Sequence, residues 1–340
     1  MSEATAGAAL PSPLPPAPAR LAENGAPRSG LFAGSVGDAS FAALQAPYAP
    51  SFLERRFIEK KWQYLFVATR EMMLSVAIID TGYLASGICA VFDRGSRRLL
   101  ANENPVLPSI SARVGDAPGD GASARLLGPG LRATIQRDAG RIAVRINWGY
   151  TAVELDLDAS AAPAPLTAIA PVGAPGRFDF TQKTALVPAQ GQVRCGNACF
   201  QVQGELAGLD YTHGFLARET AWRWAFATGR AGGRRVAFNF SEGFLQGEGE
   251  NAVWVDGDPL PAGRISFTFD GKAPLSPWRI RSEDGSVDLV FHPEGYRAQT
   301  IDLKLIKSTY LQPFGAFSGH LHGVKIDALP GVAEDHFALW

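Results

Sequence analysis

The chain has little cysteine: Cys89, Cys195 and Cys199 are the only three in 340 residues. So small and odd a number in a chain of this length excludes a disulfide scaffold. Cys195 and Cys199 are four positions apart, but no nearby Cys/His pair completes the roughly four ligands of a zinc site. The fold must therefore rest on a hydrophobic core, and the 46% of hydrophobic residues can supply one.

An excess of charge of one sign is also lacking, because 32 basic residues nearly balance 33 acidic ones. A general nucleic-acid interface needs a basic surface, so we expect no nucleic-acid partner. No run reaches the ~18–20 apolar residues of a membrane helix. The N-terminus has neither the positive start nor the apolar stretch of a signal peptide. We expect a cytoplasmic protein without stable membrane insertion.

Motifs for common cofactors are absent as well. The chain has no G-x-x-x-x-G-K-[ST] phosphate loop, no G-x-G-x-x-G that opens a helix and no G-x-S-x-G nucleophile elbow. We therefore expect no cofactor. His320 and His322 alternate as two metal ligands on a strand can, but a third ligand would have to come from Glu334 or His336 through the fold. No metal site is predicted.

The prevailing signal in the chain is alternation of apolar and polar residues. Such alternation places one face of a strand in a core and the other towards solvent or a cavity. Asp-Gly pairs punctuate the runs, as they do in tight hairpin turns. We predict an all-β fold of antiparallel strands, with a minor helix near residues 51–59. The alternating runs include Trp62-Tyr64-Phe66, Ile142-Val144-Ile146, Trp222-Trp224-Phe226, Val236-Phe238-Phe240 and Val287-Leu289-Phe291.

An internal repeat divides the chain. The run from Trp62 to Thr69 lines up with the run from Trp222 to Thr228 at an offset of 160 positions, and residues 76–78 meet residues 236–238 at the same offset. Residues 1–30 are rich in Ala and Pro and are predicted to be a disordered tail. We predict two lipocalin-like antiparallel β-barrels, over residues 31–190 and 191–340. Each would have roughly eight to ten strands.

Large aromatic residues are frequent in the second half and leave two interpretations open. They can fill a solid barrel, or they can line a pocket for an apolar ligand. Trp222, Trp224 and Trp254 are the candidates for such a wall.

Several motifs together resemble a bacterial family, the domain of unknown function 2804. The resemblance covers about residues 31–340. The motifs are Asp210-Tyr211-Thr212-His213-Gly214, Arg218, Trp222-Arg223-Trp224, Lys61-Trp62-x-Tyr64, Asp80-x-Gly82-Tyr83, Asn239, Glu250-Asn251-x-x-Trp254, Asp256-Gly257, Phe314-Gly315-x-Phe317-x-Gly319 and Glu334-x-His336-x-x-x-Trp340.

That family looks like a distant relative of carotenoid 1,2-hydratase and AttH-like proteins. The resemblance implies two calycin barrels, and a segment with Asp, His and a Trp-x-Trp strand after the domain boundary. Asp210, His213, Trp222 and Trp224 stand in comparable places. A hydratase-like activity is implied more weakly than the fold, because a fold does not fix a function.

His213 is the leading catalytic candidate, because an imidazole exchanges protons near neutral pH. Asp210 can orient His213 or donate a proton itself, and it can also simply cap a turn. Glu250 is a third candidate for proton transfer. We expect the substrate to be bound by Trp222, Trp224, Trp254, Asn239, Asn251 and Arg218, with Asn239, Glu250 and Asn251 close to His213.

The leading hypothesis is a cofactor-independent enzyme for an apolar isoprenoid-like or fatty substrate. Protonation of a carbon–carbon double bond would lead to hydration or cyclisation, with aromatic faces stabilising the cation. One alternative is a carrier that binds an apolar small molecule without chemistry. Another is a scaffold with two solid barrels and a protein-binding surface.

Overall fold

The structure, a computed structural model, describes residues 12–247 and 249–340. Within these ranges the chain forms large antiparallel sheets, which confirms the all-β prediction. The single α-helix found there, α1 (Phe52–Ile58), lies where the sequence predicts a helix, and Ser51 caps it by accepting a hydrogen bond from the Glu54 amide. None of the described helices has the length and apolar character needed to cross a bilayer.

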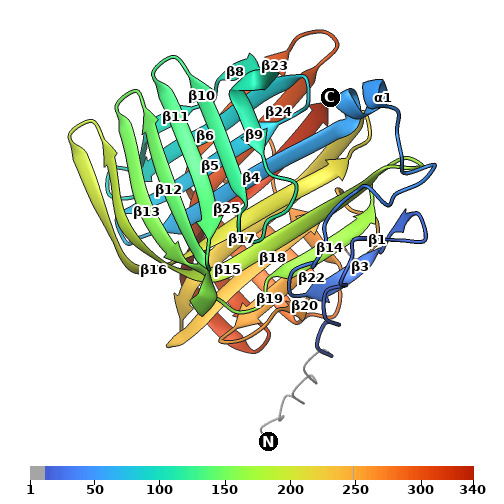
Figure 1. Cartoon of the computed structure of the whole chain (residues 1–340). Coiled ribbons are helices and arrows are strands. Elements are labelled where there is room, and N and C mark those ends of the chain that lie inside the picture. Colours follow the sequence, from blue (N-terminus) through green and yellow to red (C-terminus); the bar gives the residue numbers. More distant parts are fainter. Residues whose placement is uncertain (1–11, 248) are drawn as a thin grey trace, which may run out of the picture.

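The first sheet runs from the N-terminal part of the chain to Phe215 (blue to yellow in Figure 1). Its main path is β7-β6-β5-β4-β16-β15-β13-β12-β11-β10-β9, and β3, β8 and β14 attach at its sides. Its strands are β3 (Gly30–Ala33), β4 (Glu59–Ala68), β5 (Met72–Asp80), β6 (Leu84–Asp93), β7 (Arg98–Glu103), β8 (Val106–Pro108), β9 (Ala112–Val114), β10 (Ser123–Gly128), β11 (Leu131–Asp138), β12 (Arg141–Trp148), β13 (Thr151–Asp158), β14 (Leu166–Pro171), β15 (Phe178–Cys195) and β16 (Ala198–Phe215).

The second sheet has the order β20-β19-β18-β17-β25-β24-β23-β22-β21. Its strands are β17 (Glu219–Ala231), β18 (Arg234–Glu242), β19 (Ala252–Val255), β20 (Leu260–Pro261), β21 (Ile265–Thr268), β22 (Trp278–Ser282), β23 (Val287–Asp302), β24 (Lys307–Leu321) and β25 (Val324–Leu339). A small ribbon, β1 (Ala22–Glu23) with β2 (Ala26–Pro27), and two 3₁₀ turns, η1 (Ser109–Ser111) and η2 (Ala159–Ala161), complete the fold.

Each sheet curls around a core of its own. In the first, β9 comes round to lie against β5, and the enclosed core includes Leu65, Val76 and Val144. In the second, β21 comes round to β18, and Phe238 and Phe291 lie in its core. A third apolar cluster lies between the two curled sheets. The chain is therefore a pair of barrel-like halves that pack against each other.

The repeat explains how the halves pack. Three pairs of residues, each 160 positions apart, contact one another between β4 and β17. The ring centroids are 6.2 Å apart for Trp62–Trp222, 5.4 Å for Tyr64–Trp224 and 6.2 Å for Phe66–Phe226. Equivalent residues meet in this way only next to a two-fold axis. A local two-fold axis therefore passes between β4 and β17.

Two predicted boundaries differ from the structure. The predicted barrel boundary at 190/191 falls inside β15, because β15 and β16 form a long hairpin that belongs to the first sheet. The chain passes to the second sheet between Phe215 and Glu219. In the predicted tail, residues 1–11 lie outside the described residues, whereas residues 12–30 are ordered by β1, β2, a bridge from Pro16 to Ala33, and the buried Leu21.

Candidate functional site

A cleft opens between the two halves, beside the local two-fold axis. Its volume is about 720 Å³, including the part open to solvent. Its composition, aromatic walls with a few polar groups, is typical of small-molecule sites. The aromatic wall residues are Trp62, Tyr64, Trp222, Trp224, Phe244, Tyr310 and Trp340, and the ionisable ones are Lys183, Asp210, Glu250, Glu334 and His336.

Two of the carboxyl groups occupy equivalent places in the repeat. Asp210 on β16 pairs with Tyr64 of β4, and Glu334 on β25 pairs with Trp224 of β17. Tyr64 and Trp224 are themselves equivalent, so each half contributes one acid to the cleft at the same point of its sheet.

Each acid accepts a hydrogen bond from the first tryptophan of its own repeat. Trp62 Nε1 donates to Asp210 Oδ2 at 3.3 Å, and Trp222 Nε1 donates to Glu334 Oε1 at 2.7 Å. The indole nitrogens thus fix both carboxyl groups beside the stacked tryptophan rings.

The two acids differ in the side chain that the adjacent strand places beside each of them. Lys183 on β15 lies opposite Asp210, and its Nζ is 2.6 Å from Asp210 Oδ1. Gln312 on β24 occupies the corresponding place beside Glu334, and its Nε2 donates to Glu334 Oε2 at 3.3 Å. An ammonium group balances a carboxylate charge, whereas a neutral amide does not. Asp210 therefore has a cation in direct contact, whereas the charge of Arg297 acts on Glu334 without an ion pair between them.

Glu334 is buried and held by short hydrogen bonds. The Tyr310 hydroxyl donates to Glu334 Oε2 at 2.6 Å. Burial raises the pKa of Glu334 to about 7, although the hydrogen bonds from Tyr310 and Trp222 favour the ionised form. A carboxyl group with this pKa is largely protonated just below neutral pH and can act as a general acid.

A second group of charges lies around Lys183. Its Nζ is also 3.1 Å from Oε2 of Glu250, which is almost fully buried. Burial raises the pKa of Glu250 despite this ammonium group. Burial, helped by the charge of Glu250, also raises the pKa of Asp179 well above its usual range, and neither carboxyl oxygen of Asp179 has a hydrogen-bond partner among the described residues. These two acids hold protons more readily than exposed carboxyl groups do.

Asn239 lies behind the wall of the cleft and holds two of the wall residues by hydrogen bonds. It is fully buried; its Oδ1 accepts a hydrogen bond from Trp224 Nε1 at 2.8 Å, and its Nδ2 donates to the Glu250 carbonyl at 2.7 Å. Asn239 does not line the cleft. Asn239 therefore positions Trp224 and Glu250. The prediction from the sequence, that Asn239 contacts the substrate directly, differs from this arrangement.

The chain matches the sequence model of a protein family. The model of a domain of unknown function, DUF2804, matches residues 18–340. The chain belongs to this family. A comparison with curated proteins found no match.

Solved structures share the fold of this DUF2804 protein at low identity. An AttH from Nitrosomonas europaea superposes with a TM-score of 0.51 at 13% identity, over 86% of this chain and 98% of that one. CghA in its structure with Sch210972 has a TM-score of 0.53 at 13% identity, over 94% and 96%. Kievitone hydratase from Nectria haematococca has a TM-score of 0.46 at 10% identity, over 86% and 93%. The first two confirm the expected AttH-like, calycin-type fold.

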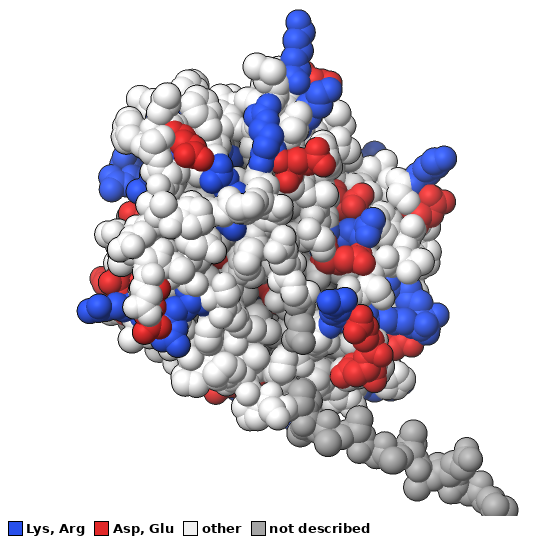
Figure 2. Space-filling model, turned by 90° about the vertical axis from the view of Figure 1, so that its right-hand side faces the viewer, with Lys and Arg blue, Asp and Glu red and all other residues white. Residues whose placement is uncertain are grey.

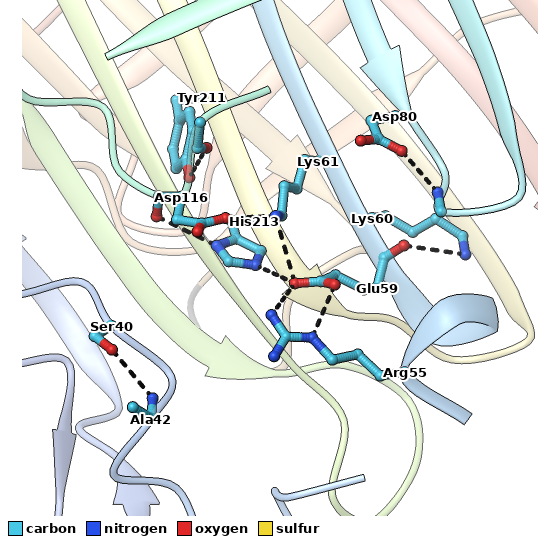
Figure 3. Close-up of polar contacts among 12 residues, drawn as sticks. Ser40, Ala42, Arg55, Glu59, Lys60, Lys61, Asp80, Asp116, Tyr211 and His213 are labelled. Atoms are coloured by element: carbon cyan, nitrogen blue, oxygen red, sulfur yellow. Dashed lines mark hydrogen bonds and ion pairs between the residues drawn. The ribbon is translucent and has the colours of Figure 1, made fainter. Parts of the chain in front are cut away.

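His213 of the DUF2804 chain does not share a site with Asp210. The two residues are three positions apart on β16, so their side chains leave opposite faces of the sheet. His213 points into the first barrel, where its Nε2 lies 2.8 Å from Glu59 Oε1 (Figure 3). Its ring also stacks on Phe41, with the ring centroids 4.0 Å apart. The predicted cluster of Glu250, Asn239 and Asn251 is therefore near Asp210 rather than His213.

His213 lies in a cluster of charged side chains that bind one another. Arg55 and Lys61 both lie near the Glu59 carboxylate, at 2.6 and 3.5 Å (Figure 3). Burial opposes ionisation of Glu59, but the hydrogen bonds from His213 and Arg55 prevail and hold its pKa below the usual range. Burial lowers the pKa of His213, so the imidazole is neutral at physiological pH. This cluster links α1 to β4 and β16 at one end of the first barrel.

Three other predicted binding residues also lie outside the cleft wall. Trp254 is fully buried between the halves and donates to the Ala164 carbonyl at 3.1 Å. Asn251 accepts from the Ser241 amide at 2.6 Å and donates to the Gly263 carbonyl at 3.0 Å, so it orders a turn. Arg218 is exposed and binds the Leu305 carbonyl.

The histidines considered for a metal are far apart. His320 pairs with Lys325 near one end of β24, while His336 pairs with Tyr310 near the other. In the part of the chain that the structure describes, no three His, Cys, Asp or Glu side chains converge as a metal site would require.

Glu334 and Lys183 line the cleft, but the sequence did not lead us to predict either as a catalytic or substrate-binding residue. Glu334 appears in the C-terminal family motif, and it follows the apolar pair Val332-Ala333 in a strand whose partner is the Trp222–Trp224 strand. Its signal was its place two residues after Val332, on the face of β25 that follows the apolar alternation. Lys183 has no comparable motif, and only the pairing of β15 with β16 brings it to Asp210.

Proposed function

We propose that this protein is a cofactor-independent enzyme that binds an apolar, isoprenoid-like or fatty substrate in the cleft and protonates a carbon–carbon double bond. Water addition or cyclisation then follows. The observation that carries the proposal is Glu334, whose pKa is raised to about 7 inside a cleft with aromatic walls.

The proposed step balances without another reactant. The O–H bond of the Glu334 carboxyl breaks as a C–H bond forms on one alkene carbon, which leaves a carbocation on the other carbon. Water, or a second double bond or hydroxyl of the substrate, attacks the cation, and the proton released returns to the carboxylate. Trp222 and Trp224 line the cleft and offer ring faces that stabilise a cation.

Asp210 has a complementary role in this proposal. Its nearest cation, Lys183, is already bound to it at 2.6 Å, so the pair presents a fixed dipole to the cleft. A pre-oriented carboxylate can stabilise the carbocation or accept a proton from the attacking water. Glu250, which shares Lys183, is the nearest proton reservoir.

The fold relatives lend limited support. CghA, a protein of this fold, has a crystal structure with the compound Sch210972. The proposal that an organic molecule binds in the cleft of the DUF2804 chain is consistent with that structure.

Mass spectrometry under native conditions, followed by extraction, tests occupancy of the cleft. Turnover is then measured in D₂O on polyenes, prenylated phenols and unsaturated fatty acids. Wild type should place one deuterium from solvent on a product carbon. Glu334→Gln should lose on the order of 10²-fold or more in kcat, the usual contribution of a general acid.

Asp335→Asn is the matched control, because Asp335 is the next residue of β25, lies on the opposite face near Arg223, and is half exposed. Full activity of Glu334→Gln would exclude Glu334 as the acid. Tight binding of an apolar molecule with no turnover in wild type would instead indicate a carrier.

A further inference from the structure

One end of the molecule exposes large apolar side chains from three separate segments. Phe52 on α1 is 90% exposed, Ile110 on η1 is 89% exposed, and Leu305 in the turn between β23 and β24 is 74% exposed. Figure 1 shows α1, β8, which leads into η1, and the β23–β24 turn together at the top of the molecule. We call these three segments the apolar rim. Leu53, Phe57, Val106 and Leu303 are exposed members of the same rim.

The rim is held in place rather than loose. No residue of α1 is buried, so the helix is not a core element. The buried ammonium group of Lys60 nevertheless fixes the C-terminal end of α1, because its Nζ donates to the Phe57 carbonyl and, at 3.1 Å, to the Thr81 carbonyl. The exposure of Phe52 and Phe57 is therefore built into the fold.

The charges around the rim are predominantly basic. Arg56, Arg218 and Lys304 are exposed and make no ion pair with any described acid. Of the rim acids, Glu54 pairs with Arg177 and Asp302 pairs with Lys307, whereas the exposed Glu219 beside Arg218 has no ion pair with a described residue. The exposed charges without an ion pair are therefore mainly basic, three against one, and Figure 2 shows basic and acidic side chains together at this upper end.

The rim also surrounds an apolar path to the cleft. A hollow of about 800 Å³, counting its open part, is lined by Val106 and Leu303 of the rim and by Tyr310 and His336. Tyr310 and His336 also line the cleft that contains Glu334. The hollow and the cleft therefore adjoin each other, with Tyr310 and His336 in the wall of both.

We propose that the apolar rim docks on an anionic lipid surface, with Phe52, Ile110 and Leu305 inserted among the headgroups and the path to the cleft facing the membrane. Protruding apolar tips together with unpaired cations are the combination that binds at an anionic membrane interface. The proposal goes beyond the proposed reaction, since docking requires no chemistry.

A lipid surface suits the rim better than a protein partner does. Specific protein interfaces are shape-complementary patches depleted of charge at their centre. Here the apolar side chains project from three separate turns, and the mouth of an apolar hollow lies among them. A bilayer adapts to such separate tips, and it is also the phase in which an apolar substrate dissolves.

The test is sedimentation of the full chain with phosphatidylcholine vesicles, with and without phosphatidylglycerol. Wild type should sediment with the anionic vesicles and much less with the neutral ones. The triple variant Phe52→Ser, Ile110→Ser, Leu305→Ser should lose at least about tenfold in partitioning, because interfacial binding scales with buried apolar area. Arg56→Gln with Lys304→Gln should weaken binding to anionic vesicles alone.

Tyr150→Ser is the matched control. Tyr150 is also 90% exposed, but it precedes Thr151, which pairs with Cys195 at the end of β15 opposite the strand end near α1. The serine positions are solvent-exposed, and thermal unfolding confirms that each variant is folded. Glu334→Gln should bind vesicles as wild type does, so failure of the proposed reaction and failure of docking are separate results.

Three outcomes would overturn the proposal. They are wild type that does not sediment with either vesicle, a triple variant that sediments as wild type does, and equal loss in Tyr150→Ser. Wild type that instead forms a vesicle-independent dimer, dispersed by the triple variant, would show that the rim is a protein interface.

Discussion

The indole rings of Trp62 and Trp222 stack at 6.2 Å, although 160 positions separate them in the chain. Each indole nitrogen donates to a carboxyl group of its own half, Asp210 or Glu334. Only one of the two acids has a lysine partner. The repeat thus places two acids in one cleft and gives them different neighbours, and different environments are how paired carboxyl groups acquire distinct roles.

Trp222→Phe should raise the pKa of Glu334 further. The ring is retained, but the hydrogen bond at 2.7 Å that favours the ionised carboxylate is lost. Hydrogen bonds to charged groups contribute about 1.5–3 kcal/mol, so an upward shift of about one to two pKa units is expected. Infrared titration of the carbonyl stretch of neutral carboxyl groups measures it.

Trp62→Phe is the control for this titration, because Trp62 donates to Asp210 instead. An unchanged titration in Trp222→Phe, or an equal change in Trp62→Phe, would show that the indole does not set the protonation of Glu334.

Glu334→Gln should make the protein more stable at alkaline pH. The folded-state pKa of Glu334 is about 7 and the unfolded value is about 4.3. As the pH rises between these values, the unfolded chain releases a proton that the folded chain keeps, and this destabilises the fold by up to about 4 kcal/mol. The glutamine cannot ionise, so this cost disappears.

Urea denaturation at pH 5 and pH 8 measures the difference. The gain should be largest at pH 8 and fall to about 1 kcal/mol at pH 5, apart from the altered hydrogen bonds. Asp335→Asn should gain much less, because Asp335 is half exposed. A variant that is less stable than wild type at both pH values would place the folded pKa of Glu334 near its ordinary value.

Alternation in the sequence was sufficient to predict the strands and their faces. The Trp62-Tyr64-Phe66 and Trp222-Trp224-Phe226 runs do form equivalent strands, and the structure adds that they pack on each other. The same alternation places the side chains of Asp210 and His213 on opposite faces of the strand, because the two residues are three positions apart. The prediction that joined them treated this segment as a loop, whereas β16 continues to Phe215.

The rest of the site depends on tertiary pairing. Lys183 is 27 positions from Asp210 and 67 from Glu250, and it meets both only because β15 pairs with β16 and the second half packs against this face. No local pattern specifies such a meeting. The pKa of Glu334 depends likewise on burial between the halves, which composition and periodicity do not determine.

His213→Ala should affect stability and leave the cleft intact. His213 is 2% exposed and contacts Glu59 at 2.8 Å within the first barrel. Loss of a buried hydrogen bond that leaves its partner unsatisfied costs about 1–3 kcal/mol. Urea denaturation should show this loss, while binding of the apolar dye anilinonaphthalene sulfonate to the native protein stays unchanged. Lost dye binding at unchanged stability would return His213 to the ligand site.

Lys183→Met should destabilise the fold strongly, and more so at high pH. The side chain is 4% exposed and is the ammonium partner of Asp210 at 2.6 Å and of Glu250 at 3.1 Å. Removing one partner of a buried ion pair costs about 3–5 kcal/mol, because the remaining charge is left without compensation. Burial already raises the pKa of Glu250, and without the opposing charge of the lysine Glu250 retains its proton still more strongly when folded than when unfolded. The cost should therefore shrink as the pH falls below about 4, where the unfolded carboxyl groups are also protonated.

Thermal and urea unfolding at pH 5 and pH 8 check this expectation. Lys307→Met is the matched control: it removes the same group from an ion pair with Asp302 in which both side chains are about half exposed, and it should change stability little. Adding Glu250→Gln to Lys183→Met should recover part of the lost stability, because one of the two uncompensated acids becomes neutral. If Lys183→Met were as stable as Lys307→Met, the two acids would not depend on Lys183 for their charge, and Asp210 could not differ from Glu334 for the reason argued above.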